Sequence, residues 1–352
     1  MNGLNRETLR IIDANVNRLG EGLRVLEEFA RMTLDDTDLT LRLKDLRHQT
    51  IILPTGLLVK LLDARESASD VGSDMNVSEQ EPDRGVPETV IANARRIQEA
   101  LRVLEELAKL PGSGLDSETY RRARFSVYTI EKDLLMKLQK EDKLSRLKGL
   151  YVIIDAGFLQ GRDPAVLTRA VIRGGAGIIQ YRDKINGIRD MLSIAATVRD
   201  VCRESGTLFI VNDSLETALA VDADGLHVGQ DDMPVDVARR LLPSDRLLGC
   251  SVRTVPEALR ARELGADHLG VGAMAATSTK EEASVVGPDR LREIKKVVAL
   301  PLVAIGGISR ANLKEIMLAG ADAACVISAV LNAEDPGIAA RELTEIIKES
   351  ES

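Results

Sequence analysis

The segment Gln180-Tyr181-Arg182-Asp183-Lys184 places an amide and two cations at alternate positions of the chain. In an extended strand alternate side chains point to the same side, so Gln180, Arg182 and Lys184 converge where an apolar run ends. Arginine and lysine placed together can hold several oxygens of a pyrophosphate. An ion-paired strand end has the same composition, so the segment alone predicts either a pyrophosphate site or a structural pairing.

Two carboxylates follow two further apolar runs: Asp213 comes after 207–211, and Asp232 comes after 224–228. Hard carboxylate oxygens beside a pyrophosphate suit Mg²⁺, with water and phosphate oxygens completing an octahedron. The alternative for Asp213 is to cap the following helix, a common role for an aspartate after a strand. The combination with the cationic segment favours a Mg²⁺ site formed by Asp213 and Asp232.

Hydroxyl groups, glycines and one ammonium follow the later apolar runs of the chain. Such groups suit a second anion, and barrels commonly bind phosphate on backbone amides after their last two strands. A glycine pair alone can be a tight turn, but its place after the seventh run favours a phosphorylated ligand. The residues are Ser251, Thr277, Thr279, Lys280, Gly307, Ile327 and Ser328.

The three histidines, His48, His227 and His268, indicate no hydrolytic or zinc chemistry. None stands in a triad-like setting or in an H-x-x-x-H pattern. His227 lies inside an apolar run, where a packed or hydrogen-bonded imidazole is more common than a general base. We therefore predict no protein nucleophile.

These residues require a scaffold that brings the ends of many strands together. Eight short apolar runs alternate with helical stretches from about residue 149 onward, which fits a (β/α)8 barrel better than the alternative, an open doubly wound sheet. Active sites of such barrels lie at the C-terminal ends of the strands. The runs are 150–154, 178–182, 207–211, 224–228, 246–250, 267–271, 301–305 and 322–327.

The first part of the chain contains an internal repeat. Residues 14–30 (ANVNRLGEGLRVLEEFA) align with residues 92–108 (ANARRIQEALRVLEELA), with identity at 11 of 17 positions. Apolar residues recur at spacings of three and four, and Arg24 and Arg102 stand among glutamates on the other face, as in amphipathic helices with ion pairs. We expect an all-α domain over 1–140, with further helices at 37–48, 51–62 and 117–140, then a linker over 141–149 and the barrel over 150–352.

The charge and aromatic content of the chain limit the classes of molecule that it is expected to bind. The 47 Lys and Arg against 55 Asp and Glu give a net charge of -8, and aromatic residues are 2% of the chain. This composition favours neither nucleic acid nor a membrane as a partner, so we expect the ligands to be small phosphorylated molecules. We also expect a soluble cytoplasmic protein that can form a homo-oligomer. Cys202, Cys250 and Cys325 are expected to be core residues rather than disulfides or metal ligands.

The barrel resembles the thiamine-phosphate synthase family over about 150–345, through QYRDK, FIVNDS, ADGLHVGQDDM, LGCS, TSTK, AIGGI and VISA. The resemblance implies a transferase that joins an aminopyrimidine diphosphate to a thiazole phosphate on a barrel with Mg²⁺, releasing pyrophosphate. It assigns Asp213 and Asp232 to the metal. It assigns the pyrimidine diphosphate to Gln180, Arg182, Lys184, Asn212 and Lys280, and the thiazole phosphate and pyrophosphate to Ser251, Thr277, Thr279, Gly307, Ile327 and Ser328. Departures are Ser214, where many members have arginine, and Ala273-Met274-Ala275-Ala276, which replaces a loop with proline and an aromatic residue.

The helical region resembles the hydroxymethylpyrimidine-phosphate kinase family that precedes some bacterial synthases, through NRLGEGLRVLEE, RESASDVG and ANARRIQEALRVLEE. That implies ATP as a second substrate, with Arg24, Arg102, Arg65, Asp70 and Gly72 as polar candidates. No G-x-x-x-x-G-K-[ST] motif is present, and the Glu/Arg face equally fits a scaffold.

Two other functions compete for the barrel. A thiazole tautomerase would need the phosphate loops but not the diphosphate and metal residues, so the presence of Lys184, Asp213 and Asp232 weighs against it. A non-catalytic sensor of thiamine precursors would bind both substrates without turnover, with the helical part binding a partner.

Overall fold

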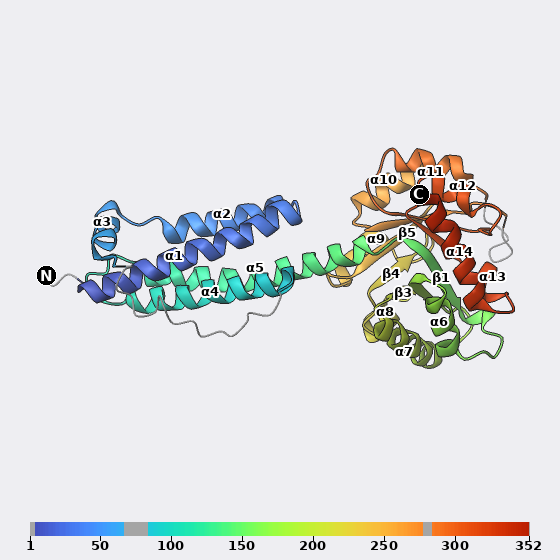
Figure 1. Ribbon diagram of the computed structural model, residues 1–352, viewed down its shortest axis with the longest axis horizontal. Coiled ribbons are helices and arrows are strands. Elements are labelled where there is room, and N and C mark those ends of the chain that lie inside the picture. Colours follow the sequence, from blue (N-terminus) through green and yellow to red (C-terminus); the bar gives the residue numbers. More distant parts are fainter. Residues whose placement is uncertain (1–3, 67–83, 277–283, 352) are drawn as a thin grey trace. The chain divides into compact units, whose positions relative to one another are not determined.

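The computed structural model describes residues 4–66, 84–276 and 284–351 of the 352-residue chain. The chain divides into two compact units, Met1–Gln139 and Lys140–Ser352 (Figure 1). No helix within the described ranges is long and apolar enough to cross a membrane. Each unit is described separately below.

The first unit is helical, as predicted. Leu19, Leu23 and Leu26 of the first repeat copy are fully buried in its core, and so are Leu101 and Leu104 of the second. The two repeat helices pack against each other, and a Cβ on Gly22 would lie 2.7 Å from Ile97 Cγ1, so a glycine allows this close approach. The helices are α1 (Arg6–Glu28), the π-helix η1 (Phe29–Thr33), α2 (Thr37–Ile51), α3 (Thr55–Ala64), α4 (Val86–Leu107) and α5 (Ser117–Ser145).

Three helices have boundaries that differ from the expected ones. The helix expected over 37–48 continues to Ile51. The helix expected over 51–62 begins at Thr55, because Pro54 is its N-cap and Ile51 ends α2. The helix expected over 117–140 continues to Ser145. The boundary between the two units therefore falls within α5.

The second unit is a closed barrel of eight parallel strands in sequence order, which confirms the predicted fold class. Each apolar run became a strand, and helices surround the strands in Figure 1. The strands are β1 (Gly149–Asp155), β2 (Ala176–Arg182), β3 (Leu208–Asn212), β4 (Gly225–Val228), β5 (Leu247–Val252), β6 (His268–Gly272), β7 (Leu302–Ile305) and β8 (Ala323–Val326). The helices are η2 (Ala156–Phe158), α6 (Pro164–Arg173), α7 (Ile188–Ser205), α8 (Leu215–Ala220), α9 (Val235–Leu241), α10 (Val255–Glu263), α11 (Gly287–Lys295), α12 (Leu313–Leu318), α13 (Ser328–Leu331) and α14 (Pro336–Glu351).

Alternation along the strands separates two apolar cores. One lies between the strands and the surrounding helices, and the other fills the barrel interior. Leu147, which follows α5, is 1% exposed and belongs to the interior core together with Tyr151, Ile178, Leu208 and Leu247. The three cysteines are buried and free, as expected of core residues.

Candidate active site

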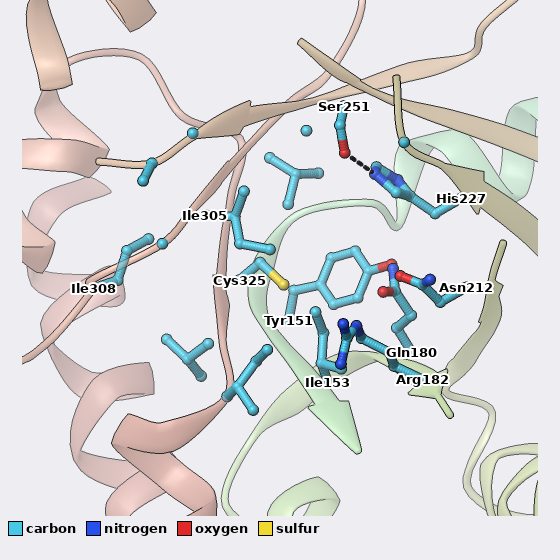
Figure 2. Close-up of a pocket in the computed structure, with 18 of the residues that line it drawn as sticks. Tyr151, Ile153, Gln180, Arg182, Asn212, His227, Ser251, Ile305, Ile308 and Cys325 are labelled. Carbon is cyan, nitrogen blue, oxygen red and sulfur yellow. Dashed lines mark hydrogen bonds between the residues drawn. The ribbon is translucent and has the colours of Figure 1, made fainter. Parts of the chain in front are cut away.

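A cavity of about 220 Å³ opens at the C-terminal ends of the strands. Its wall includes Arg182, Asn212 and Ile305, the last residues of β2, β3 and β7. Figure 2 shows the polar side chains of Gln180, Arg182 and Asn212 together on one side of the cavity. The apolar side chains of Ile305 and Ile308 lie on the other side. The cavity thus offers hydrogen-bonding groups to one part of a ligand and an apolar surface to the rest.

The predicted cationic segment lies where the sequence placed it, at the end of β2. Gln180 is buried, and its Nε2 donates a hydrogen bond to the Tyr151 hydroxyl at 2.8 Å. Arg182 forms an ion pair with Asp155, the last residue of β1. Both Gln180 and Arg182 line the cavity, so a buried carboxylate holds the guanidinium in place at its wall.

Lys184 extends from the turn that follows β2 and reaches the acidic pair instead. Its Nζ lies 2.5 Å from an Asp213 carboxylate oxygen. Asp183 fixes this turn, because its carboxylate accepts hydrogen bonds from the Tyr181 hydroxyl at 2.5 Å and from the Asn186 amide at 3.0 Å. The cation and the carboxylate follow two adjacent strands, β2 and β3, which brings them to the same end of the barrel.

Asp213 and Asp232 come together as the sequence predicted for a pair of metal ligands. Burial raises the pKa of Asp213, the neighbouring Asp232 carboxyl raises this pKa further, and the Lys184 ammonium lowers it. Asp232 accepts a hydrogen bond from the Gly229 amide at 3.0 Å. The helix-cap alternative for Asp213 is wrong: Ser214 is the N-cap of α8 and accepts the Thr217 amide, which also gives the unusual serine a role.

The two carboxylates fit a divalent cation. They are oxygen donors, and Asp232 lies close enough to disfavour ionisation of Asp213; a dication removes that conflict. No cluster of three or more histidine, cysteine or acidic side chains occurs among the residues that the structure describes. Water and ligand oxygens would have to supply the remaining coordination.

Four of the residues predicted for the second anion line the same cavity: Ser251, Gly307, Ile327 and Ser328. Gly307 has a φ of 68°, and a Cβ there would lie 2.6 Å from the Ala275 carbonyl oxygen, so this position needs glycine. Thr277, Thr279 and Lys280 lie outside the described residues.

His227 is hydrogen-bonded, as expected, but it also lines the cavity. Its Nε2 is 3.0 Å from Ser251 Oγ, the contact drawn as a dashed line in Figure 2. Burial lowers its pKa to about 4, against the opposing charge of Asp232. The sequence reading missed Tyr151 and Asp155, although Asp155 directly follows the first apolar run, the position that identified Asp213.

In the helical unit, the repeated arginines pair with glutamates of their own helices. Arg24 lies 3.0 Å from Glu28, and Arg102 lies 2.8 Å from Glu106. Arg65 makes two hydrogen bonds of 2.7 Å to the carboxylate of Asp13. Asp70 and Gly72 lie outside the described residues.

Comparison with known proteins identifies the family. The family model described as thiamine monophosphate synthase matches residues 150–330. The curated thiamine-phosphate synthase of Prochlorococcus marinus (strain MIT 9313) is 37% identical over 342 residues, covering 96% of each chain. The chain belongs to the thiamine-phosphate synthase family. Members of this family are transferases of thiamine biosynthesis, so the barrel is a transferase domain.

Other relatives agree with this family assignment. The thiamine-phosphate synthase of Thermosynechococcus vestitus is 38% identical and covers 97% of this chain and 95% of its own length. A solved structure, thiamine phosphate pyrophosphorylase from Pyrococcus furiosus, is 40% identical with a TM-score of 0.55, covering 61% of this chain and all of that one. In the helical unit, residues 10–133 match the family model described as ThiD2.

Proposed function

We propose that the cavity joins an aminopyrimidine diphosphate to a thiazole phosphate, with Asp213 and Asp232 holding Mg²⁺ at the diphosphate. One observation carries this assignment: Arg182, Lys184 and the two carboxylates gather at the C-terminal end of the barrel. A tautomerase would have no use for this charged group. The Mg²⁺ would supply positive charge to the diphosphate oxygens.

The reaction exchanges one bond for another. The bond between the pyrimidine methylene carbon and the diphosphate oxygen breaks, and its electron pair leaves with pyrophosphate. The lone pair of the thiazole nitrogen then forms the new carbon–nitrogen bond, which gives thiamine phosphate. The main catalytic requirement is to stabilise the negative charge that develops on the leaving group, and we assign this role to the cations Arg182 and Lys184.

The apolar part of the cavity has a separate role. Ile153, Ile305 and Ile308 line it, and the buried Tyr151 closes it from β1. A methylene carbon that develops positive charge would be captured by water, so an apolar wall protects it until the thiazole nitrogen attacks. Tyr151 stays protonated, because burial raises the pKa of its hydroxyl well above the ordinary value, and this hydroxyl accepts a hydrogen bond from Gln180.

The test is pyrophosphate release from both precursors with Mg²⁺. We expect pyrophosphate and thiamine phosphate in equal amounts, and Asp232→Asn should lower their formation with both substrates present. Binding of both precursors without pyrophosphate release would favour the sensor, and turnover of the thiazole phosphate alone would favour the tautomerase.

For the helical unit we propose a kinase that transfers a phosphoryl group from ATP to hydroxymethylpyrimidine phosphate. The match to residues 10–133 and the fusion to a domain that consumes the product support it. The test is ADP and diphosphate formation by the full chain with ATP, Mg²⁺ and the monophosphate. Arg24→Gln is the control and should leave the rate unchanged, since Arg24 pairs with its own helix. If no ADP formed above background, the kinase proposal would fail and the helical unit would be interpreted as a scaffold.

A further inference from the structure

The carboxylate of Asp155 contacts the arginine of the cavity wall from a buried position. Asp155 and Arg182 are the last residues of β1 and β2 and stand opposite each other in the strand register. Arg182 lines the cavity, as Figure 2 shows, whereas Asp155 is 3% exposed and does not belong to the described residues that line it. Asp155 therefore meets the cavity through its contact with the guanidinium.

The two oxygens of this carboxylate have different partners. Oδ1 accepts a hydrogen bond from the Gly157 amide at 2.8 Å, and Oδ2 accepts one from Nη1 of Arg182. An aspartate offers an acceptor oxygen to each donor, whereas an asparagine has one oxygen and would present its own NH₂ group to the other donor. The two contacts together thus require a carboxylate.

A carboxylate in this place is unfavourable for an anionic ligand. Its charge opposes a diphosphate bound at Arg182, and its burial costs hydration that its partners must restore. Capping of the short helix η2 through Gly157 does not need the charge, since asparagine caps helices about as well as aspartate does. The charge of Asp155 is therefore explained by Arg182 rather than by the cap.

The contact with Asp155 fixes the direction of the guanidinium. The N–H donors of a guanidinium lie in one plane, and one Nη1 donor points to Asp155. A plane that is held at one corner directs its other donors along fixed lines. Arginine binds phosphate groups through two parallel N–H bonds, so the affinity for a phosphate depends on these directions.

We propose that Asp155 is a positioning residue that orients the Arg182 guanidinium for two hydrogen bonds to the diphosphate of the pyrimidine substrate. The identity of the ligand rests on the proposed transferase function, whereas the orientation of the guanidinium does not. Positioning and charge have opposite effects here. Removal of a negative charge strengthens the binding of an anion, but removal of a positioning contact weakens it.

Steady-state kinetics of the full chain distinguish these two effects. Asp155→Asn and Asp155→Ser each keep a single acceptor oxygen, and either variant that retains the wild-type circular dichroism serves. Each should lower kcat/KM for the pyrimidine diphosphate about ten- to a hundredfold, the effect of one lost charged hydrogen bond, and change the KM for the thiazole phosphate less than about twofold. A lower KM for the diphosphate at unchanged kcat, or an equal loss for both substrates, would overturn the proposal.

A double-mutant cycle tests whether Asp155 acts through Arg182. In the Arg182→Gln background, Asp155→Asn should change kcat/KM for the diphosphate by less than about twofold, because the positioned group is already absent. Calorimetric binding of inorganic pyrophosphate with Mg²⁺ gives the same comparison without turnover. The same loss in both backgrounds would show that Asp155 does not act through Arg182 and would overturn the proposal.

The orientation has a spectroscopic signature that needs no ligand. In the full chain labelled with ¹⁵N-arginine, the Nη signals of Arg182 are those that disappear in Arg182→Gln. We expect separate Nη1 and Nη2 signals in the wild type, because the contact with Asp155 slows rotation about the Nε–Cζ bond, and a merged signal in Asp155→Asn. A merged signal in the wild type, or separate signals in the variant, would contradict positioning by Asp155.

Asp163 provides the matched control, as a capping aspartate of the same loop. Its Oδ1 alone accepts both cap bonds of α6, from the Ala165 amide at 2.7 Å and the Val166 amide at 3.3 Å, so an asparagine can replace it. Asp163→Asn should change kcat/KM for either substrate by less than about twofold. If the wild type formed no thiamine phosphate, the transferase function would fail, and the Arg182 signals would still decide the role of Asp155. If the wild type turned over normally and Asp155→Asn equalled it, only this inference would fail.

Discussion

Removing the residues just before β1 should destabilise the barrel, although they precede its first strand. Lys140 and Lys143 are on the last turns of α5, and Leu144 and Leu147 join the interior core. All four belong to the second compact unit. We therefore compare a fragment that begins at Lys140 with one that begins at Gly149.

The size of the effect follows from burial and ion pairs. Leu147 is 1% exposed and Leu144 is partly buried, and burial of a leucine contributes about 1.5–3 kcal/mol when complete. The Nζ of Lys140 lies 2.5 Å from an Asp267 oxygen, and the Nζ of Lys143 lies 3.4 Å from an Asp245 oxygen. Each ion pair contributes at most about 1 kcal/mol to stability. With only part of a leucine's contribution counted for Leu144, the total is about 2–6 kcal/mol, a large share of the stability of many domains.

Urea denaturation of the two fragments measures this difference. The fragment 140–352 should unfold cooperatively and form thiamine phosphate, whereas the fragment 149–352 should be less stable by about 2–6 kcal/mol. Within the longer fragment, Leu147→Ala should cost about 2–4 kcal/mol, and Leu318→Ala, at a residue 64% exposed, should cost less than about 0.5 kcal/mol. Stabilities of the two fragments within about 1 kcal/mol of each other would refute the role assigned to residues 140–148.

Other substitutions test the charged site and the buried imidazole. Asp213→Asn and Asp232→Asn should each lower turnover by orders of magnitude at saturating Mg²⁺ with unchanged circular dichroism, because each removes an anionic oxygen; unchanged turnover would contradict the metal site. Lys184→Ala should raise the KM for the pyrimidine diphosphate and lower kcat, and an effect on the thiazole phosphate alone would contradict its placement. Because burial lowers the pKa of His268 from 6.5 to about 3, the unfolded chain binds the proton more readily, and stability falls as pH drops below 6.5. Between pH 7 and pH 5, the free energy of unfolding measured in urea should therefore fall by about 2 kcal/mol less in His268→Phe than in the wild type. An equal fall in both proteins would contradict burial of a neutral His268.

The barrel could be predicted from the sequence because strands buried on both faces are continuous apolar runs, and all eight runs became strands. The polar residues at the strand ends were predictable for the same reason, since parallel strands bring their C-terminal ends together. Gln180, Arg182, Asp213 and Asp232 followed from this rule. Asp155 obeys the same rule and was missed because a lone carboxylate after the first run carried no visible partner.

Contacts that depend on register could not be predicted. Tyr151 lies inside β1, and nothing in its neighbourhood in the sequence indicates that its hydroxyl meets Gln180. His227 and His268 belong to strands separated by β5, and only the register through Gly249 brings their rings together. A single histidine in an apolar run resembles any other packed residue until its neighbour across the sheet is known.

The repeat in the helical unit extends from sequence to contacts, so the contacts that recur can be separated from those found in one half alone. Glu27 pairs with Arg24 of its own helix and with Arg47 of α2; its counterpart Glu105 pairs with Arg102 and with Arg124 of α5. Ion pairs that recur in both halves stabilise each helix pair in the same way, so they mark a structural role. Asp13 breaks the repeat, because Ile91 occupies the equivalent position, whereas Asp13 accepts two hydrogen bonds from Arg65. The Asp13–Arg65 pair is therefore a contact in which the two halves of the helical unit differ.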